Sequence, residues 1–304
     1  FSRRPIDPIK QTMNIDKRAD CGPFLFITNP KSGIGAFDEF KKSIARFSNR
    51  PDIKVVESKS EQHTESLCKS AVSDGYRSIV AVGGDGTVHS IGAQLINKDI
   101  SFGIIPTGSG NGIARHLGIS QHIPTAIKQI LSSKSRLIDT LLVNEHPAIG
   151  FCGVGFDGYV AKLFDISGKR GFRNYINLSY KAYRSYQDKR YLIDGIELKA
   201  FSVIIANINQ FGNDAFINAH AIDDDGKFEV ITINRPPFHA APSVASRLFL
   251  KTFHESRFVT RTSKSYLEID NLELASIQID GETLEPIQKL KINIVPKSLN
   301  VLVS

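Results

Sequence analysis

The stretch Ser78-Ile-Val-Ala-Val-Gly-Gly-Asp-Gly-Thr87 decides the fold, because an apolar run ends there in a turn of three glycines, an acid and a threonine. The short β-branched run is typical of a parallel strand buried on both faces. Gly83, Gly84 and Gly86 leave backbone amides that can point at phosphate oxygens. Thr87 can cap a following helix, whose N-terminus attracts anions. A glycine cluster alone fits an ordinary strand-to-helix turn equally well, so a phosphate site needs support from other loops.

Two further loops of similar chemistry follow apolar strands. The run Phe24-Leu-Phe-Ile-Thr precedes Asn29-Pro-Lys-Ser-Gly33, and Phe102-Gly-Ile-Ile precedes Pro106-Thr-Gly-Ser-Gly-Asn-Gly112. A helical pattern follows each loop, and this alternation predicts an α/β domain with an open parallel sheet, whose loops meet at one edge. Three such loops can surround a triphosphate. None has the spacing of a P-loop or of the dinucleotide fingerprint, so the sequence indicates a different nucleotide-binding fold.

The pattern changes near Asp139 from strands alternating with helices to shorter strands separated by turns. Later runs such as Phe201-Ser-Val-Ile-Ile-Ala-Asn207 and Phe228-Glu-Val-Ile-Thr-Ile233 alternate in the way of antiparallel strands. We therefore predict an N-terminal arm over residues 1–21, a nucleotide-binding domain over 22–139 and a mainly antiparallel β-sandwich over 140–304.

Composition and charge narrow the class of protein and the kind of partner it can bind. The chain has 304 residues, 41% hydrophobic, with a formal net charge of +7 and a pI near 9.2. It reads as globular, and no window approaches the ~20 apolar residues that span a bilayer. The positive charge fits an anionic partner such as a nucleotide, a nucleic acid or an acidic membrane surface. Three widely spaced cysteines predict reduced thiols in a cytoplasmic protein.

In this order, the loops Asn29–Gly33, Gly83–Thr87 and Pro106–Asn111 resemble the nucleotide loops of the diacylglycerol kinase and sphingosine kinase superfamily. The resemblance to soluble bacterial lipid kinases of that superfamily covers nearly the whole chain. It implies an enzyme that uses ATP and Mg²⁺ to phosphorylate a hydroxyl of diacylglycerol or a related lipid. It also implies that the last strand returns toward the nucleotide domain.

Other functions stay open at this point. A sphingoid-base or ceramide kinase belongs to the same superfamily, and NAD kinases share the Gly-Gly-Asp-Gly turn. A nucleotide- or lipid-binding module without catalysis is a third alternative, and the oligomeric state can be monomer or homodimer. No nucleic-acid partner is expected.

The expected nucleotide contacts combine glycine amides, hydroxyls and family-matched polar side chains. Ser58 stands where relatives often have a threonine, and Lys31 can supply a point charge to the phosphates. The full set is Asn29, Lys31, Ser32, Ser58, Gly83, Gly84, Gly86, Thr87, Thr107, Gly108, Ser109 and Asn111.

Two acids are candidates for the chemistry. Resemblance to sphingosine kinases implies that Asp85 is the base, whereas resemblance to bacterial diacylglycerol kinases implies Glu282, in Asp280-Gly-Glu282. One carboxylate would take or orient the hydroxyl proton while the other helps to hold Mg²⁺. Asp85 is the candidate ligand of this catalytic Mg²⁺. By its sequence alone, Asp280-Gly-Glu282 favours a hairpin turn. Asp223 and Asp225 resemble a segment that binds a structural Mg²⁺ in some bacterial members.

One departure from the family pattern follows the glycine turn. Many relatives have an asparagine and a glutamate there, and this chain has His89-Ser90. A histidine at this position is similar to sphingosine-kinase-like sequences. The lost acid motivates the non-catalytic alternative and leaves the lipid backbone, glycerol or sphingoid, open.

The segment Lys162 to Arg190 holds most of the positive charge. Its basic residues are Lys162, Lys169, Arg170, Arg173, Lys181, Arg184, Lys189 and Arg190, and its acids are Asp165 and Asp188. Tyr175, Leu178, Ala182 and Tyr186 are spaced as one helical face. The pattern alone favours a packed amphipathic helix with a solvated basic face. The functional interpretation is a peripheral contact with an anionic membrane surface.

Overall fold

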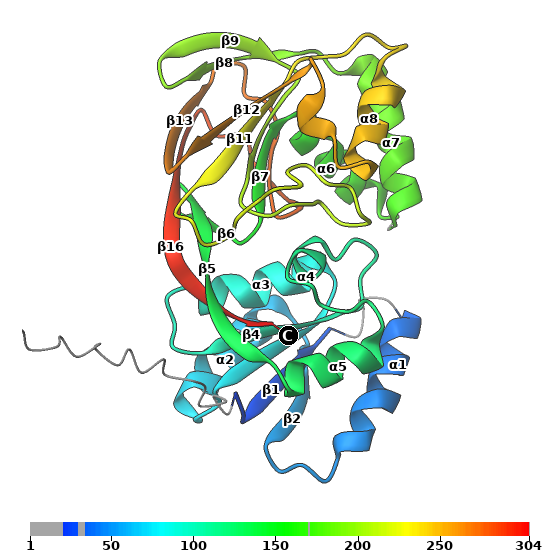
Figure 1. Cartoon of the computed structure of the whole chain (residues 1–304), viewed down its shortest axis with the longest axis vertical. Coiled ribbons are helices and arrows are strands. Elements are labelled where there is room, and N and C mark those ends of the chain that lie inside the picture. Colours follow the sequence, from blue (N-terminus) through cyan, green and yellow to red (C-terminus); the bar gives the residue numbers. More distant parts are fainter. Residues whose placement is uncertain (1–20, 30–33, 170, 304) are drawn as a thin grey trace, which may run out of the picture.

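The computed structural model describes residues 21–29, 34–169 and 171–303, arranged as two lobes (Figure 1). The N-terminal lobe comprises β1–β4 and α1–α5, and the C-terminal lobe comprises β6–β15 and α6–α8. Most of the predicted arm lies outside the described residues. So do Lys31, Ser32 and Arg170.

The N-terminal lobe is built on four parallel strands in the order β2-β1-β3-β4. Every residue of β1, β3 and β4 is buried, which explains their continuous apolar runs. Helices α2 and α3 cover one face of the sheet and α1 and α5 the other (Figure 1). The elements are β1 (Phe24–Thr28), α1 (Ile34–Ile44), η1 (Ala45–Phe47), β2 (Ile53–Glu57), α2 (Glu61–Ser73), β3 (Ser78–Gly83), α3 (Asp85–Leu95), β4 (Ser101–Pro106), α4 (Gly112–His116) and α5 (Ile123–Leu131). The predicted open parallel sheet is confirmed.

Two long antiparallel strands join the lobes. Strands β5 (Lys134–Val143) and β16 (Lys289–Val303) pair with each other and run from one lobe into the other (Figure 1). The C-terminal part of β16 also lies parallel to β4, with Asn300 opposite Ser101. Backbone pairing therefore continues across position 139 and fixes the two lobes relative to each other.

The C-terminal lobe is the predicted β-sandwich. Among the described residues, one sheet of 6 strands in the order β12-β11-β10-β7-β14-β15 faces the part of the other sheet formed by β16, β13, β8 and β9. Buried apolar side chains such as Val154, Val203, Leu267 and Leu290 fill the space between them. The strands are β6 (His146–Ala148), β7 (Phe151–Gly155), β8 (Lys189–Ile193), β9 (Ile196–Ala200), β10 (Ser202–Ala206), β11 (Phe228–Ile233), β12 (Val259–Lys264), β13 (Tyr266–Asn271), β14 (Ile277–Ile279) and β15 (Glu282–Leu284).

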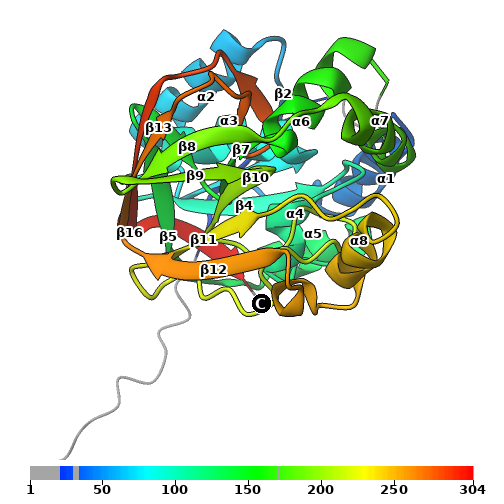
Figure 2. The same cartoon turned by 90° about the horizontal axis from the view of Figure 1, so that it is seen from above.

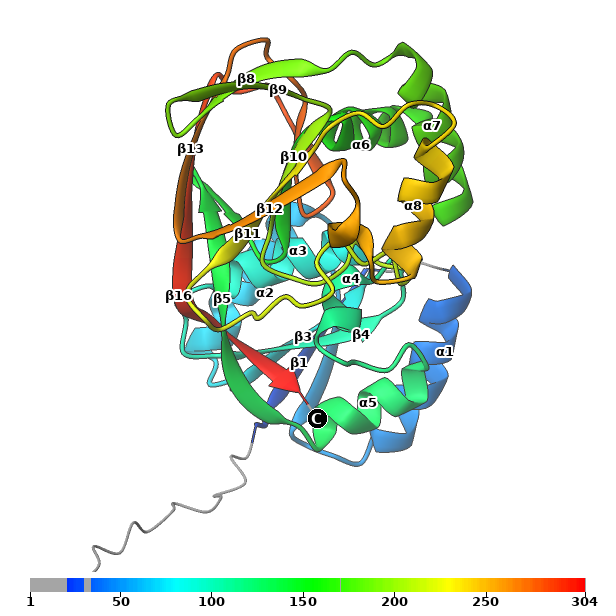
Figure 3. The same cartoon turned by 45° about the horizontal axis from the view of Figure 1, so that its top comes forward.

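Helices cover one side of the sandwich. Figures 2 and 3 show α6 (Phe156–Ser167), α7 (Phe172–Ser185) and α8 (Ala241–Phe249) on the side away from β13, and η2 (Phe253–Glu255) follows α8. No helix in the described part of the chain is long and apolar enough to cross a membrane.

The basic segment from Lys162 to Arg190 is not a single helix. It comprises the second half of α6, all of α7 and the start of β8. Ala182 and Tyr186 are buried, as their predicted helical face requires. Lys189 and Arg190 instead belong to β8, where both pair with Glu273 at 3.8 and 2.8 Å. These two cations are therefore not part of the helical surface.

Candidate functional site

Asn29, directly after β1, and the loops after β3 and β4 meet at one edge of the parallel sheet. The Asn29 amide donates to the Thr87 hydroxyl at 3.3 Å, and the Thr107 amide N–H donates to the Gly83 carbonyl at 2.9 Å. A Cβ on Gly108 would lie 2.6 Å from the Cα of Gly84, so these two loops touch backbone to backbone. The sheet thus brings the predicted phosphate loops together.

Asp85 links two of these loops. It is the first residue of α3, and its carboxylate accepts hydrogen bonds from the backbone amides of Asn111 at 2.9 Å and Gly112 at 2.8 Å. Burial raises the pKa of Asp85, and the two amide donors oppose that shift. The fit is close, since a Cβ on Gly110 would lie 2.8 Å from the Asp85 Oδ2. Asp85 therefore holds the loop after β4 against the glycine turn.

Asn111 closes the loop after β4 on itself. Its side-chain oxygen accepts from the Gly108 N–H at 3.0 Å, and its amide donates to the Gly108 carbonyl and to Gln121, each at 2.9 Å. Its φ of 55° is left-handed, a conformation that asparagine tolerates better than most residues. Ser109 is left exposed at the tip of the turn.

Ser58 follows β2 at the same edge of the sheet. Its N–H donates to the Thr28 carbonyl at 2.8 Å, and its hydroxyl bonds to Thr64 and to the Ser60 carbonyl in the first turn of α2. This geometry places Ser58 beside the loops, while its role as a phosphate contact stays a prediction.

The C-terminal lobe contacts the loop after β4 through Gly212, and the sequence did not predict this contact. Gly212 forms an isolated β-bridge with Asn111, and the Asn213 N–H donates to the Gly110 carbonyl at 3.2 Å. The φ of Gly212 is 115°, and a Cβ there would lie 2.7 Å from the Gly110 carbonyl carbon. The glycine in Phe211-Gly212-Asn213 is the one sign of this contact in the sequence, but a glycine alone does not show which residues lie against it.

Glu282 reaches the glycine turn from the C-terminal lobe. It begins β15 after a tight turn through Asp280 and Gly281, so the segment is also the hairpin that its sequence favours. Its Oε1 would lie 3.7 Å from a Cβ on Gly86, and its side chain is 51% exposed. Burial raises the pKa of Glu282, while the charge of His89 opposes the shift. The two candidate acids thus stand at the same turn, one from each lobe.

His89 lies between the two acids of the hairpin. Its Nδ1 is 2.9 Å from the Asp280 Oδ2, and its Nε2 is 3.9 Å from the Glu282 Oε2. Desolvation would lower the pKa of His89, but the hydrogen bond and charge of Asp280 and the charge of Glu282 raise it overall. In the sequence, His89 stands out only as a departure from the family pattern. Its partner is 191 positions away, so no local signal could reveal the contact.

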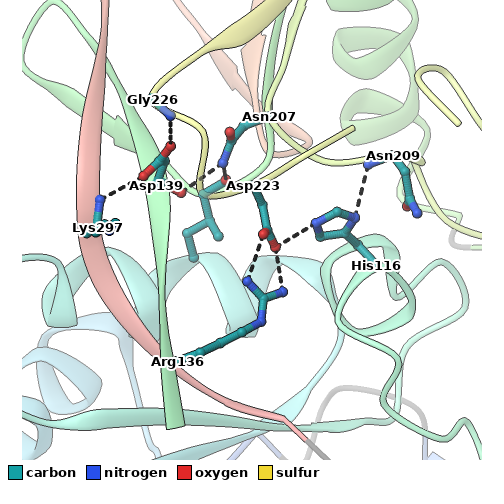
Figure 4. A network of polar contacts seen from close by, with 9 residues as sticks. His116, Arg136, Asp139, Asn207, Asn209, Asp223, Gly226 and Lys297 are labelled. Carbon is teal, nitrogen blue, oxygen red and sulfur yellow. Dashed lines mark hydrogen bonds and ion pairs between the residues drawn. The ribbon is translucent and has the colours of Figure 1, made fainter. Parts of the chain in front are cut away.

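Asp223 lies in a polar network at the junction of the lobes (Figure 4). Both of its oxygens accept from the Arg136 guanidinium, at 2.7 and 2.8 Å, and one also bonds the His116 Nε2 at 2.9 Å. Desolvation is outweighed by these donors, which hold the pKa of Asp223 well below its usual range.

The carboxylate of Asp225 accepts from the Lys227 N–H at 3.0 Å. In the parts of the chain that the structure describes, no group of three or more His, Cys, Asp and Glu side chains is arranged to hold a metal ion. The structural Mg²⁺ at Asp223 and Asp225 therefore remains a prediction from resemblance.

Comparison with known families agrees with this architecture. Residues 23–143 match the family described as the diacylglycerol kinase catalytic domain, and residues 150–303 match the YegS C-terminal NAD kinase beta sandwich-like domain. The chain therefore belongs to the diacylglycerol kinase family that combines these two domains. The predicted family and fold are confirmed.

Individual relatives are distant. The chain is 26% identical over 239 residues to an uncharacterised protein of Synechocystis, a match that covers 75% of this chain and 55% of that protein. It spans about half the length of the first curated relatives it matches. A Pseudomonas aeruginosa protein named "Probable lipid kinase YegS-like" is 27% identical over 243 residues, 77% of this chain and 79% of the relative.

A crystal structure of a diacylglycerol kinase from Bacillus anthracis is similar with a TM-score of 0.72. The superposition covers 92% of this chain and 96% of that one at 20% identity. At this identity the likeness supports the fold.

Proposed function

We propose that the chain is an ATP-dependent lipid kinase that transfers the γ-phosphate to a hydroxyl of diacylglycerol or a related lipid. One observation carries the proposal: a carboxylate of the C-terminal lobe, Glu282, lies over Gly86 of the glycine turn. A kinase needs a phosphate cradle and a group that orients the acceptor hydroxyl, and here the two face each other.

The phosphates would bind at the turn between β3 and α3. The amides of Gly83, Gly84 and Gly86 and the positive end of the α3 dipole favour an anion there. The Asp85 carboxylate fits a hard cation, because each oxygen accepts one backbone N–H and keeps a further lone pair. Asp85 would hold Mg²⁺ together with phosphates and waters. When bound, the ion neutralises charge on the transferring phosphoryl group.

Glu282 is the better candidate for the base. As the lipid oxygen bonds to the γ-phosphorus and the bond to the leaving ADP oxygen breaks, the hydroxyl proton passes to the Glu282 carboxylate. Its raised pKa makes it a stronger proton acceptor than an ordinary surface carboxylate. The pKa of Asp85 is raised as well, but the N–H groups of Asn111 and Gly112 hold its carboxylate against the neighbouring loop, whereas Glu282 reaches over Gly86 from the facing lobe.

The outer surface of α7 suits an anionic membrane, where a lipid substrate resides. Ile176, Tyr180 and Phe238 are 49%, 56% and 50% exposed, and the ring of Tyr180 lies 6.0 Å from that of Phe238. Exposed cations surround them, and the Arg184 guanidinium lies 5.4 Å from the Phe238 ring. Exposed aromatic and apolar side chains beside cations are typical of membrane-surface helices. The proposed α7 surface consists of Arg173, Ile176, Tyr180, Lys181, Arg184 and Phe238.

A lipid panel tests the function. The purified chain is incubated with Mg²⁺, ATP labelled on the γ-phosphate, and in separate reactions diacylglycerol, sphingosine, ceramide or NAD. We expect label in diacylglycerol above the other acceptors. Label in sphingosine or ceramide would assign a different lipid backbone, and label in NAD would make the chain a NAD kinase. Nucleotide binding without any labelled acceptor would contradict a kinase function.

A further inference from the structure

Asp280, His89 and Glu282 form a line of side chains that starts in the protein interior and ends at the glycine turn. The side chains of Asp280 and His89 are 1% and 13% exposed, whereas that of Glu282 is 51% exposed. His89 comes from α3 and the two acids come from the hairpin of β14 and β15. A buried pair therefore backs a more exposed carboxylate.

Asp280 fixes the orientation of the His89 ring. Its oxygens accept three backbone N–H groups, from Ile149 at 2.7 Å, Gly150 at 2.8 Å and Phe151 at 2.9 Å. A carboxylate held by three donors acts as an acceptor, so the His89 Nδ1 carries the hydrogen that bridges to it at 2.9 Å. The Nε2 then faces Glu282.

A hydrogen-bond donor would hold the Glu282 carboxylate over Gly86. The charges that act on it include the acids Glu61, Asp165 and Asp280, which repel it, while His89 attracts it. Asp280 and Glu61 also act on His89 and favour its charged form. An imidazolium donates from both ring nitrogens, so it can bond Asp280 and Glu282 together once the 3.9 Å separation of Nε2 and Oε2 shortens.

We propose that His89 is a positioning residue that holds the Glu282 carboxylate over the glycine turn from the fixed support of Asp280. With Oε2 bound to the His89 Nε2, Oε1 faces the space above Gly86, where the acceptor hydroxyl must approach the γ-phosphate. The catalytic part of this inference rests on the proposed kinase function.

Two substitutions of His89 separate its two contacts. The amide nitrogen of asparagine reaches the place of Nδ1, so His89→Asn keeps the bond to Asp280 and loses the reach to Glu282. The amide of glutamine reaches the place of Nε2, so His89→Gln keeps a donor for Glu282. We expect His89→Asn to lower kcat by about 10-fold or more with the KM for ATP unchanged, and His89→Gln to restore most of that loss. Equal kcat in the two variants, or a loss confined to KM, would overturn the proposal.

A spectroscopic test does not depend on catalysis. In ¹⁵N NMR spectra of the imidazole rings, the His89 signals are those missing from His89→Asn. We expect Glu282→Gln to shift the Nε2 signal of His89 and leave its Nδ1 signal, which reports the bond to Asp280, nearly unchanged. An Nε2 signal at the same chemical shift in the wild type and in Glu282→Gln would refute the contact. If the contact is seen but the lipid panel shows no transfer, the kinase function fails and the positioning contact stands.

Discussion

Glu282 lies over Gly86, with its Oε1 3.7 Å from the place where a Cβ would stand on that glycine. The two residues belong to different lobes, so neither lobe contains the whole site. Strands β5 and β16 run through both lobes and fix the position of Glu282 relative to Gly86. The geometry of the site therefore depends on the strands that connect the two lobes.

Replacing Glu282 by glutamine should remove the proton acceptor and keep the shape of the side chain. We expect kcat to fall by about 10² to 10⁴-fold, the range for loss of a general base, with the affinity for ATP little changed. Steady-state kinetics on the preferred lipid measure both. Glu197→Gln is the control, because Glu197 on β9 is similarly exposed and pairs with Arg190. A normal kcat in Glu282→Gln would show that Glu282 is not the base and that another group accepts the proton.

Replacing Asp85 by asparagine should act differently, because Asp85 holds a loop. An asparagine oxygen can accept from the N–H of Asn111 or of Gly112, but its NH₂ group would face the other. We expect the free energy of unfolding to fall by about 1–3 kcal/mol and the Kd for ATP to rise. Denaturant titration and calorimetry measure the two effects. Unchanged stability together with unchanged ATP binding would show that the two hydrogen bonds contribute little.

Gly108→Ala should separate the two phosphate loops. The new methyl group would lie 2.6 Å from the Gly84 Cα, and backbone atoms on both sides must move. We expect a loss of about 1–3 kcal/mol in stability, the usual cost of overpacking, together with weaker ATP binding. Gly35→Ala is the control, because a Cβ there meets no atom within 4 Å and alanine is the better helix residue. Similar ATP affinity in both variants would argue against contact between the loops as a requirement for binding.

The sequence predicted the strands and loops, which local patterns encode. It did not predict the contacts between residues that lie far apart in the chain. Buried apolar runs and glycine loops identified β1, β3 and β4 and the edge at which they end, because each signal lies within a few residues. The contact between His89 and Asp280 joins positions 191 apart, and nothing near either residue specifies it. The same holds for Gly212, whose need for glycine comes from Gly110 in the other lobe.

Charge patterns were the least specific signals. The acids around Asp223 do not by themselves specify a metal, and the structural Mg²⁺ there stays a prediction from resemblance. The described structure pairs this carboxylate with Arg136 and His116, which lie far away in sequence. Basic residues from 162 to 190 were grouped as one segment, yet the fold divides them between helices and β8. A charge run does not show which residues share a surface, because the chain turns within it.

The Asp223 network should stabilise the junction of the lobes in a pH-dependent way. Its folded-state pKa lies below the unfolded value, so its contribution is complete above about pH 4, the ordinary pKa of aspartate, and is lost as the pH falls further. Asp223→Asn should lower the free energy of unfolding by about 3 kcal/mol at neutral pH, because Arg136 then loses its partner. Urea titrations at neutral and acid pH measure this. The exposed neighbour Asp224, changed to asparagine, is the control, and equal stability in both variants would contradict the prediction.

The proposed α7 surface should bind anionic vesicles through its cations. Changing Arg173, Lys181 and Arg184 to glutamine should weaken binding by about 3 kcal/mol, or roughly 100-fold, at about 1 kcal/mol for each cation near the surface. Co-sedimentation with vesicles containing phosphatidylserine measures the affinity, and the difference should shrink at high salt. The matched control removes the same charge from exposed lysines of the N-terminal lobe, Lys42, Lys54 and Lys128. Because both triple variants have the same net charge, equal weakening would attribute vesicle binding to overall charge, and a selective loss in the α7 variant would assign it to that surface.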